Sequence, residues 1–290
     1  MQEKVLLTIN TKDFNPYLGD DGVNISFVNN IVHDCPFTLV YQNNQDRLVS
    51  LSTINTTIDI HSHQPMHFYV EDIVSFYWVN NENNMQVHLY PNGSSELARY
   101  WYLHIVLPIF YSLNGKYSFL HTGTVLVNNN PILFMADSFG GKSTITDYFM
   151  KKGHTLVTDD KLASYEDSGE FMAVPSIPYH RPYRKAEDLG HYVENFATKA
   201  YKMDIIYQLH KADSDAEILF TEVKGLEKFS CLHKGSEMNF GFNMKSHVPY
   251  LSRLANKIRL FKINMPWNLE RQDEVYHAIL NHLKKVQNAT

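Results

Sequence analysis

The chain has 290 residues, 44% of them hydrophobic, and carries a formal net charge of −5 at pH 7. This length and apolar content suit one large domain or two ordinary ones and argue against intrinsic disorder. The acidic balance and dispersed basic residues argue against nucleic acid as a partner. Two cysteines, Cys35 and Cys231, form no disulfide framework in a chain of this size, which indicates a reducing compartment.

The N-terminal third alternates apolar and polar residues in short runs. These runs extend from Lys4 to about Tyr90 and are separated by Asn, Asp, Gly and Pro, which predicts a β-rich N-terminal domain over residues 1–95. At the start of the chain, MQEKVLLTIN places charged residues before too short an apolar run for a signal peptide. We therefore expect a cytoplasmic protein.

A helical pattern begins near Glu96 and continues through WYLHIVLPIFYSL at 101–113. That apolar segment is too short to span a bilayer and contains Pro108, so we interpret it as a buried helix and expect no membrane partner. PNGSSE at 91–96 supplies turn and cap residues just before it. The predicted domain boundary lies there, with a second domain over residues 96–290.

The second domain alternates strand and helix patterns, which predicts an α/β (α+β) fold. A glycine at position 153 ends the helix expected from Ser143 to Lys152. In chain order we expect a strand pair in SFLHTGTVLVN, a buried strand PILFMA, a helix from Ser143 to Lys152, a strand HTLVT, a long helical stretch over 187–210, a strand IRLFKI and a last amphipathic helix DEVYHAILNHLKKV.

PILFMADSFGGKST, from Pro131 to Thr144, contains the second half of a phosphate-binding loop. Such a loop needs backbone N–H groups on phosphate oxygens, a lysine on the terminal phosphates and a hydroxyl on Mg²⁺. The apolar strand before it and the helix after it match that requirement. The predicted ligands of ATP are Ser138, Gly140, Gly141, Lys142, Ser143 and Thr144, with Ser143 also on Mg²⁺.

The first half of the motif departs from the usual pattern. Ala136 replaces the leading glycine, and Phe139 stands in the middle of a loop that normally uses small residues. A side chain at a position that needs a positive φ would be strained, although it could project outward. Two readings follow, a working loop or a degenerate, non-catalytic nucleotide site.

Two adjacent carboxylates follow the next strand. GHTLVTDDKLASY places Asp159 and Asp160 at the end of HTLVT, close to where a neighbouring strand releases the loop. One carboxylate can hold Mg²⁺, and the other can accept the proton of an attacking hydroxyl. Taken alone, the pair favours a turn or an N-cap, because Asp-Asp is common in loops.

LHTGTV, the loop and KKGHTLVTDD together resemble the HPr kinase/phosphorylase superfamily and its shorter HPr-kinase-like serine kinase relatives. The resemblance is strong over 118–162 and extends weakly over about 95–290. It implies a P-loop kinase fold related to that of phosphoenolpyruvate carboxykinase, preceded here by the β-rich domain. It also implies an ATP- and Mg²⁺-dependent kinase that phosphorylates a hydroxyl, in particular that of serine, on a small molecule, peptide or protein.

Carried over by position, the resemblance implies that Asp159 and Asp160 are the metal ligand and the catalytic base. His121 would lie near the transferred phosphoryl group, or else be a half-buried structural histidine. Arg181, Arg184 and Lys185 would be substrate clamps or a solvated basic loop. The oligomeric state stays open.

Two observations limit or compete with this reading. The bifunctional HPr enzymes carry a Glu-Ile-Arg-Gly-Leu-Gly signature soon after the paired aspartates, whereas here the nearest match, at 222–228, is far downstream, which argues against HPr as the substrate. DIHSHQPMH at 59–67 has the spacing of metal ligands in His61, His63 and His67, which suggests metal-dependent hydrolysis as a further alternative.

Overall fold

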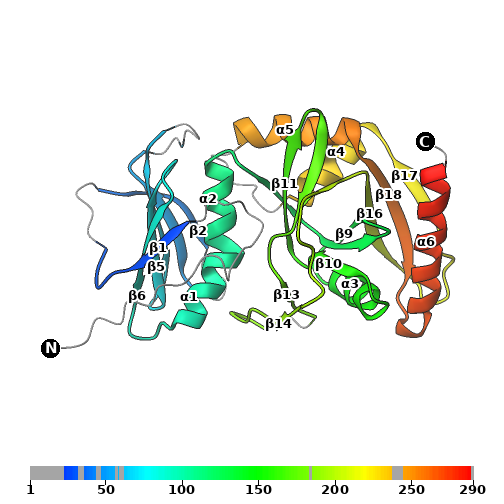
Figure 1. Cartoon of the computed structure of the whole chain (residues 1–290), viewed down its shortest axis with the longest axis horizontal. Coiled ribbons are helices and arrows are strands. Elements are labelled where there is room, and N and C mark those ends of the chain that lie inside the picture. The colour runs from blue at the N-terminus through cyan, green and yellow to red at the C-terminus, as the bar shows by residue number, and fades with distance from the viewer. Residues whose placement is uncertain are drawn as a thin grey trace. The chain divides into compact units, whose positions relative to one another are not determined.

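The structure is a computed structural model that describes residues 23–31, 36–43, 47–55, 58, 62–182, 185–236 and 244–288 (Figure 1). By their contacts these residues fall into two compact units, which divide between Ser118 and Phe119. Two short stretches from later in the sequence, Lys185–Asp188 and 244–246, are grouped with the N-terminal unit. Several sheets and helices make the chain a mixed α/β protein.

The N-terminal unit contains a sheet in which six described strands lie in the order β1-β6-β5-β4-β3-β2. Neighbouring strands are antiparallel, except that β1 runs parallel to β6. Side chains of β4 alternate between half-buried and buried positions, as expected for a sheet with one covered face. The β-rich N-terminal region is therefore confirmed. Its strands are β1 (Asn24–Phe27), β2 (Thr38–Asn43), β3 (Val49–Thr53), β4 (Pro65–Val70), β5 (Val74–Val79) and β6 (Asn84–Leu89).

A helical segment follows this sheet and packs against it. The Ser94 hydroxyl caps its start by accepting a hydrogen bond from the N–H of Leu97 at 3.1 Å. The rings of Trp78 in β5 and Phe110 lie 6.3 Å apart, centroid to centroid. Because the segment buries its apolar face on the sheet, the units divide after it, at Ser118, whereas the sequence analysis expected the boundary before it, at residue 95. It comprises α1 (Ser95–Trp101), the π-helical turn η2 (Tyr102–Val106) and α2 (Leu107–Leu113).

The C-terminal unit contains a mixed sheet whose described strands have the order β10-β8-β9-β16-β18-β17. The three strands β9, β16 and β18 are parallel, so their carboxyl ends meet at one edge of the sheet. Loops at that edge are where open α/β sheets bind ligands. The strands are β8 (Gly123–Val127), β9 (Asn130–Met135), β10 (Thr155–Thr158), β16 (Ile205–Ala212), β17 (Phe220–Val223) and β18 (Arg259–Pro266).

A smaller sheet of the same unit has the described order β15-β12-β11-β7. A two-stranded ribbon, β13 with β14, follows β12 along the chain. The elements are β7 (Ser118–His121), β11 (Lys161–Asp167), β12 (Glu170–Val174), β13 (Tyr179–His180), β14 (His191–Tyr192) and β15 (Tyr201–Lys202).

Two expected elements are wrong. The predicted strand pair in SFLHTGTVLVN is divided between the two sheets, because the chain turns at Thr122, whose N–H donates to the carbonyl oxygen of Asp160 at 3.1 Å. The long helix expected over 187–210 is replaced by short strands and by the first part of β16. Ile205 to Gln208 lie between β9 and β18, and a central parallel strand reads as a near-continuous apolar run without strict alternation.

Helices cover both faces of the mixed sheet and complete two cores. In one, Phe149 of α3 lies 5.2 Å from Phe134 of β9 and 4.8 Å from Tyr276 of α6, between ring centroids. In the other, Leu232 of α4 and Leu251 of α5 share a buried cluster with Leu133 of β9. The expected loop helix and last helix are confirmed. The helices are α3 (Lys142–Lys151), α4 (Gly225–Lys234), α5 (Met244–Lys257), the 3₁₀ turn η4 (Leu269–Arg271) and α6 (Gln272–Asn288).

Among the helices that the structure describes, each is too short or too polar to cross a bilayer.

Helix α3 approaches β8 so closely that one contact position has no room for a side chain. A Cβ atom on Gly123 would lie 2.0 Å from Oγ1 of Thr146 and 3.3 Å from Cγ of Lys142. The Thr146 hydroxyl in turn donates to the carbonyl oxygen of Lys142 at 2.9 Å. Gly123 therefore sets how near the first turn of α3 lies to the sheet.

Gly123→Ala should lower the free energy of unfolding by about 2 kcal/mol, because the added methyl group overpacks this contact. Thr146→Ala removes the nearest atom, so the double variant should lose less stability than the sum of the two single variants. Urea denaturation of the four proteins measures the coupling. Strict additivity would show that the Gly123 contact is not the constraint described here.

Candidate functional site

The segment between β9 and α3 folds as a tight loop at the edge where the parallel strands of the mixed sheet end. The N–H of Gly140 donates to the carbonyl oxygen of Asp137 at 2.8 Å and closes the first turn. Gly141 follows in a left-handed conformation, φ +89°, and is the N-cap of α3. This backbone conformation favours glycine, and a Cβ there would also displace the Cε atom of Met265, which would lie 2.6 Å away. The sequence motif thus adopts the strand, loop and helix arrangement predicted for it.

Phe139 occupies the strained position that the sequence raised. Its φ is +61°, a conformation that costs an L-residue with a large side chain about 1 kcal/mol or more. Its side chain is 80% exposed, so the ring projects away from the loop. The sequence allowed for this outward orientation. The strain is therefore not offset by burial of the ring within this loop.

The first turn of α3 presents the groups that a phosphate requires. The N–H of Ile145 donates to the carbonyl oxygen of Gly141 at 3.0 Å, which leaves the N–H groups of residues 142–144 outside the helical ladder. These groups lie at the positive end of the helix dipole. The Lys142 side chain is only 7% exposed, and its Nζ lies 3.2 Å from Oδ1 of Asp160.

A cavity of about 420 Å³ opens beside this turn, entirely within the C-terminal unit. It brings together predicted residues from three separate parts of the sequence, and its wall also includes Lys211 and Trp267, which sequence reasoning missed. The predicted residues in its lining are His121, Ser138, 140–144 and Arg181.

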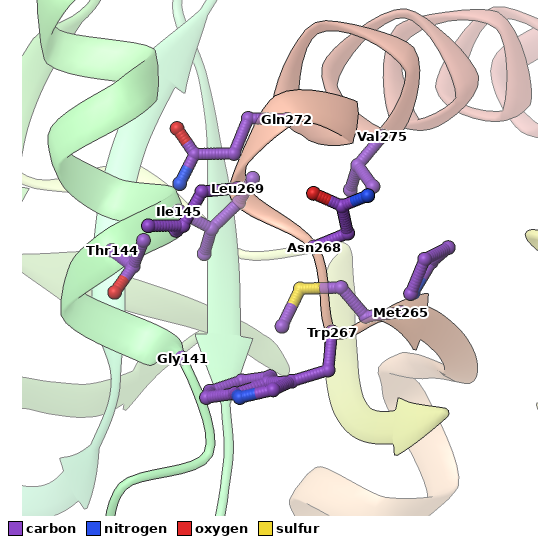
Figure 2. A pocket seen from close by; sticks show the side chains of 10 residues that line it. Gly141, Thr144, Ile145, Met265, Trp267, Asn268, Leu269, Gln272 and Val275 are labelled. Carbon is purple, nitrogen blue, oxygen red and sulfur yellow. The ribbon is translucent and has the colours of Figure 1, made fainter. Parts of the chain in front are cut away.

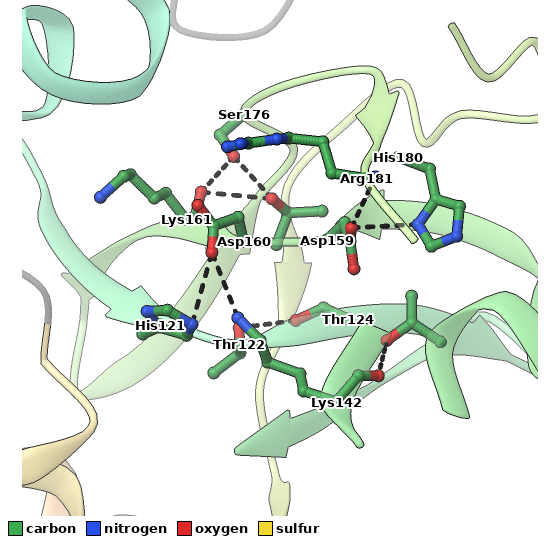
Figure 3. Close-up of polar contacts among 12 residues, drawn as sticks. His121, Thr122, Thr124, Lys142, Asp159, Asp160, Lys161, Ser176, His180 and Arg181 are labelled. Carbon is green, nitrogen blue, oxygen red and sulfur yellow. Dashed lines mark hydrogen bonds and ion pairs between the residues drawn. The ribbon is translucent and has the colours of Figure 1, made fainter. Parts of the chain in front are cut away.

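Asp160 lies directly behind that lining and contacts two of its members. Its Oδ1 atom is 3.2 Å from Nζ of Lys142 and 3.4 Å from Nε2 of His121 (Figure 3). The backbone holds it in place, because its carbonyl oxygen accepts the N–H of Thr122. His121 is fixed by its own N–H, which donates to the carbonyl oxygen of Gly235 at 2.7 Å. The fold thus brings Lys142, His121 and Asp160, which the sequence analysis singled out separately, into contact with one another.

Asp159 points to the other side of the same turn and is only 3% exposed. Its Oδ2 atom accepts the backbone N–H of Arg181 at 2.9 Å and lies 3.0 Å from Nδ1 of His180. Burial by itself raises the pKa of Asp159, but the attraction of His180 outweighs it and holds the pKa below its usual value. Its Oδ1 atom is buried and has no hydrogen-bond partner among the described residues.

His180 is a site residue that the sequence did not reveal. It lies in β13, is 4% exposed, and stands between two carboxylates, with Nε2 3.4 Å from Oδ1 of Asp147 in α3. These contacts are ion pairs rather than well-aligned hydrogen bonds. Burial lowers the pKa of His180, yet the two aspartates outweigh this and raise it. No sequence spacing joins His180 to Asp147 and Asp159, because the β11–β12 hairpin separates His180 from both aspartates along the chain.

Lys211 and Trp267 were missed for a different reason. Lys211 is in β16 and Trp267 follows β18, so both come from the carboxyl ends of parallel strands. The sequence pattern assigned the residues before Lys211 to a helix, which concealed its place at a strand end. Its Nζ lies 3.7 Å from the centroid of the Trp267 ring, and the N–H of Trp267 donates to the carbonyl oxygen of Ala212 at 3.1 Å.

Other predicted positions are not brought to this cavity. Lys185 is grouped with the N-terminal unit, and Arg184 lies outside the described residues. His61 is outside them too, while the ring of His67 in β4 lies against that of Phe37, with centroids 5.7 Å apart. Within the described part of the chain, no three His, Cys, Asp or Glu side chains are grouped to hold a metal ion. The hydrolase alternative thus gains no support.

Comparison with known proteins gave a limited result. No protein-family model matches the chain, and no curated protein matches it. A solved structure similar to it is the Hpr(Ser) kinase/phosphatase from Coxiella burnetii, at 13% sequence identity and a TM-score of 0.34. That similarity covers 58% of this chain and 98% of the other. The functional argument below therefore rests on the geometry of the site.

Replacing His180 with glutamine should lower the free energy of unfolding by about 3 kcal/mol near pH 6, because Asp159 is left buried without its counter-charge. Since folding raises the pKa of His180, its contribution is complete below the unfolded value of about 6.5 and is lost as pH rises through the folded value. Thermal and urea unfolding from pH 5 to 9 should show the two proteins converging as pH rises.

The matched control is His191→Gln, because His191 pairs with His180 across the β13–β14 ribbon but is exposed. It should change stability by less than about 0.5 kcal/mol at every pH. A His180→Gln deficit that is constant or grows from pH 6 to pH 9 would contradict the ion-pair account.

Phe139→Asn and Phe139→Ala both remove the exposed ring, but asparagine tolerates a positive φ better than alanine does. The asparagine variant should therefore be the more stable by about 0.5–1 kcal/mol in urea denaturation. Equal stability of the two would mean that the loop carries no backbone strain at this residue.

Proposed function

We propose that the chain is an ATP- and Mg²⁺-dependent phosphotransferase that transfers the γ-phosphate to a hydroxyl group, such as that of a serine, on a small molecule, peptide or protein. One observation carries the proposal: Lys142, in the first turn of a helix after a glycine loop, lies 3.2 Å from one of two adjacent aspartates at the edge of a ligand-sized cavity. A phosphoryl-transfer site needs this combination of cation, helix N-terminus and carboxylates.

Phosphate binding falls to the loop and to the cations around it. The N–H groups of residues 142–144 can donate to phosphate oxygens, and the Lys142 ammonium can reach the terminal phosphates. Arg181 and Lys211 line the same cavity, so each can neutralise further phosphate charge. A triphosphate would thus meet positive charge from three separate segments of the fold.

The residues also fit Mg²⁺. This ion keeps several waters and uses one or two carboxylates together with the substrate phosphates, so a complete protein cage is not required. The buried Oδ1 atom of Asp159 supplies an acceptor that has no described protein partner, and the Ser143 hydroxyl follows Lys142 in the same turn. When bound, Mg²⁺ would neutralise charge on the β- and γ-phosphates.

We assign the base to Asp160 and the metal side to Asp159. Asp160 is 23% exposed next to the cavity wall, whereas the Asp159 carboxylate is buried and its low pKa keeps it ionised. In the transfer, the acceptor oxygen forms a bond to the γ-phosphorus, the bond from that phosphorus to the β–γ bridging oxygen breaks, and the acceptor proton passes to Asp160. His121, which contacts Asp160, can stabilise the carboxylate or donate to the phosphoryl oxygens.

A second candidate function is nucleotide binding without turnover, in a regulatory protein. The feature that favours it is the loop itself, in which Ala136 replaces the usual first glycine and Phe139 is strained. This candidate needs Lys142 for binding but has no need of a base, so Asp160 separates the two.

Lys142→Ala should weaken Mg·ATP binding by at least roughly 100-fold, because a buried cation on the phosphates is lost. Asp160→Asn should retain binding but lower turnover roughly 10²- to 10⁴-fold, the usual contribution of a general base. Calorimetry measures binding, and ADP release in the presence of serine-containing metabolites and peptides measures turnover. Lys151→Ala is the control, since Lys151 lies on the same helix but is 71% exposed.

Unchanged Mg·ATP binding in Lys142→Ala would overturn both candidate functions. Binding that depends on Lys142, without acceptor-dependent ADP release by the native protein, would favour the regulatory protein over the phosphotransferase.

A further inference from the structure

A second cavity adjoins the phosphate cavity and has the opposite character. It has a volume of about 180 Å³ and lies between the N-terminal half of α3 and the segment that joins β18 to α6 (Figure 2). Its wall is formed largely by apolar side chains, including Ile145, Met265, Leu269 and Val275. No charged side chain is part of that wall.

The two cavities share three residues, Gly141, Thr144 and Trp267. A ligand held by its phosphates at the first turn of α3 can therefore extend past Thr144 into the apolar cavity. The Trp267 ring stands at this junction, with the Lys211 ammonium 3.7 Å from its centroid on the phosphate side of the wall. Together the two volumes fall within the range typical of small-ligand sites, which are mostly apolar with a few placed polar groups.

Exposed apolar side chains mark the same place. Seven large hydrophobic residues are exposed in the described part of the chain, and three of them, Phe139, Trp267 and Leu269, line one or both cavities. Trp267 is 50% and Leu269 75% exposed. Such a local concentration indicates a surface that a ligand covers.

The segment that carries these side chains is held in position before any ligand arrives. Arg271 donates to the carbonyl oxygens of Ser214 and Ala216 at 3.0 and 2.9 Å, and it pairs with Glu274. The Asn268 side chain accepts the N–H of Glu270 at 3.0 Å and caps η4. The cavity is thus formed in advance, which lowers the entropic cost of binding.

We infer that this apolar cavity, bounded by Trp267, Leu269 and Gln272, is the adenine site of the nucleotide whose phosphates lie on the loop. The inference rests on the proposed function and adds to it the place where the base of ATP binds and the residues that select it. A planar aromatic base suits an apolar slot beside an indole ring.

The polar groups of the cavity favour adenine over guanine. The Gln272 carboxamide, which extends from the start of α6 toward α3 in Figure 2, carries both a donor and an acceptor. Glutamine pairs with N6 and N7 of adenine, whereas guanine is recognised chiefly by arginine or lysine, which this wall lacks. The other amide, on Asn268, already caps η4.

Calorimetry with Mg·ATP, Mg·GTP and Mg·tripolyphosphate, which has phosphates but no base, tests the inference on the full chain. The native protein should bind ATP roughly tenfold or more tightly than tripolyphosphate, the order expected for one stacked base. Leu269→Ser should remove most of that difference and leave tripolyphosphate binding unchanged. Gln272→Ala should reduce the preference for ATP over GTP. The matched control is Leu226→Ser in α4, since Leu226 is 88% exposed and lines neither cavity.

The outcomes separate this inference from the proposed function. Equal affinity of the native protein for ATP and tripolyphosphate, or ATP binding unaffected by Leu269→Ser, would overturn the adenine site while the phosphate site stands. GTP bound as tightly as ATP, with no effect of Gln272→Ala, would overturn the assignment of adenine. Failure of all three ligands to bind would overturn the phosphate site and the adenine site together.

Discussion

The contact on which the site depends is the ion pair between Lys142 and Asp160. A lysine that is 93% removed from water requires a counter-charge, because an unpaired ammonium in that position would be strongly destabilising. The pair connects the first turn of α3 to Asp160, the second residue after β10. Gly123 allows α3 to lie close enough to the sheet for this contact to form. Phosphate oxygens entering the cavity would meet a lysine already held in place.

The paired aspartates have unlike surroundings although they are adjacent in sequence. Because successive residues after a strand point in different directions, Asp160 faces Lys142 and His121, whereas Asp159 faces His180 and the backbone of Arg181. One carboxylate is therefore partly exposed beside the cavity and the other is buried, ionised and fixed. This difference gives a physical basis for dividing the roles of base and metal-side ligand between them.

The parallel arrangement of β9, β16 and β18 explains why the remaining site residues come from distant segments. Each strand ends at the same edge of the sheet, so the glycine loop after β9, Lys211 near the end of β16 and Trp267 after β18 converge there. A polar cavity and an apolar one then lie next to each other, separated by Trp267. An anionic group and an aromatic group of one ligand can be bound side by side without either entering the wrong environment.

The sequence by itself determined the local parts of this protein. The apolar run before the loop, the glycines within it and the helical pattern after it identified β9, Gly141 and α3, since each depends on residues close together in the chain. The tertiary structure alone decided the rest. β16 was mistaken for part of a helix because a strand buried on both faces lacks strict alternation, and this concealed Lys211. His180 and Trp267 reach the site only through strand pairing, and the helices before residue 118 joined the N-terminal unit because they bury their apolar face on its sheet. Such long-range packing depends on contacts that no local pattern records.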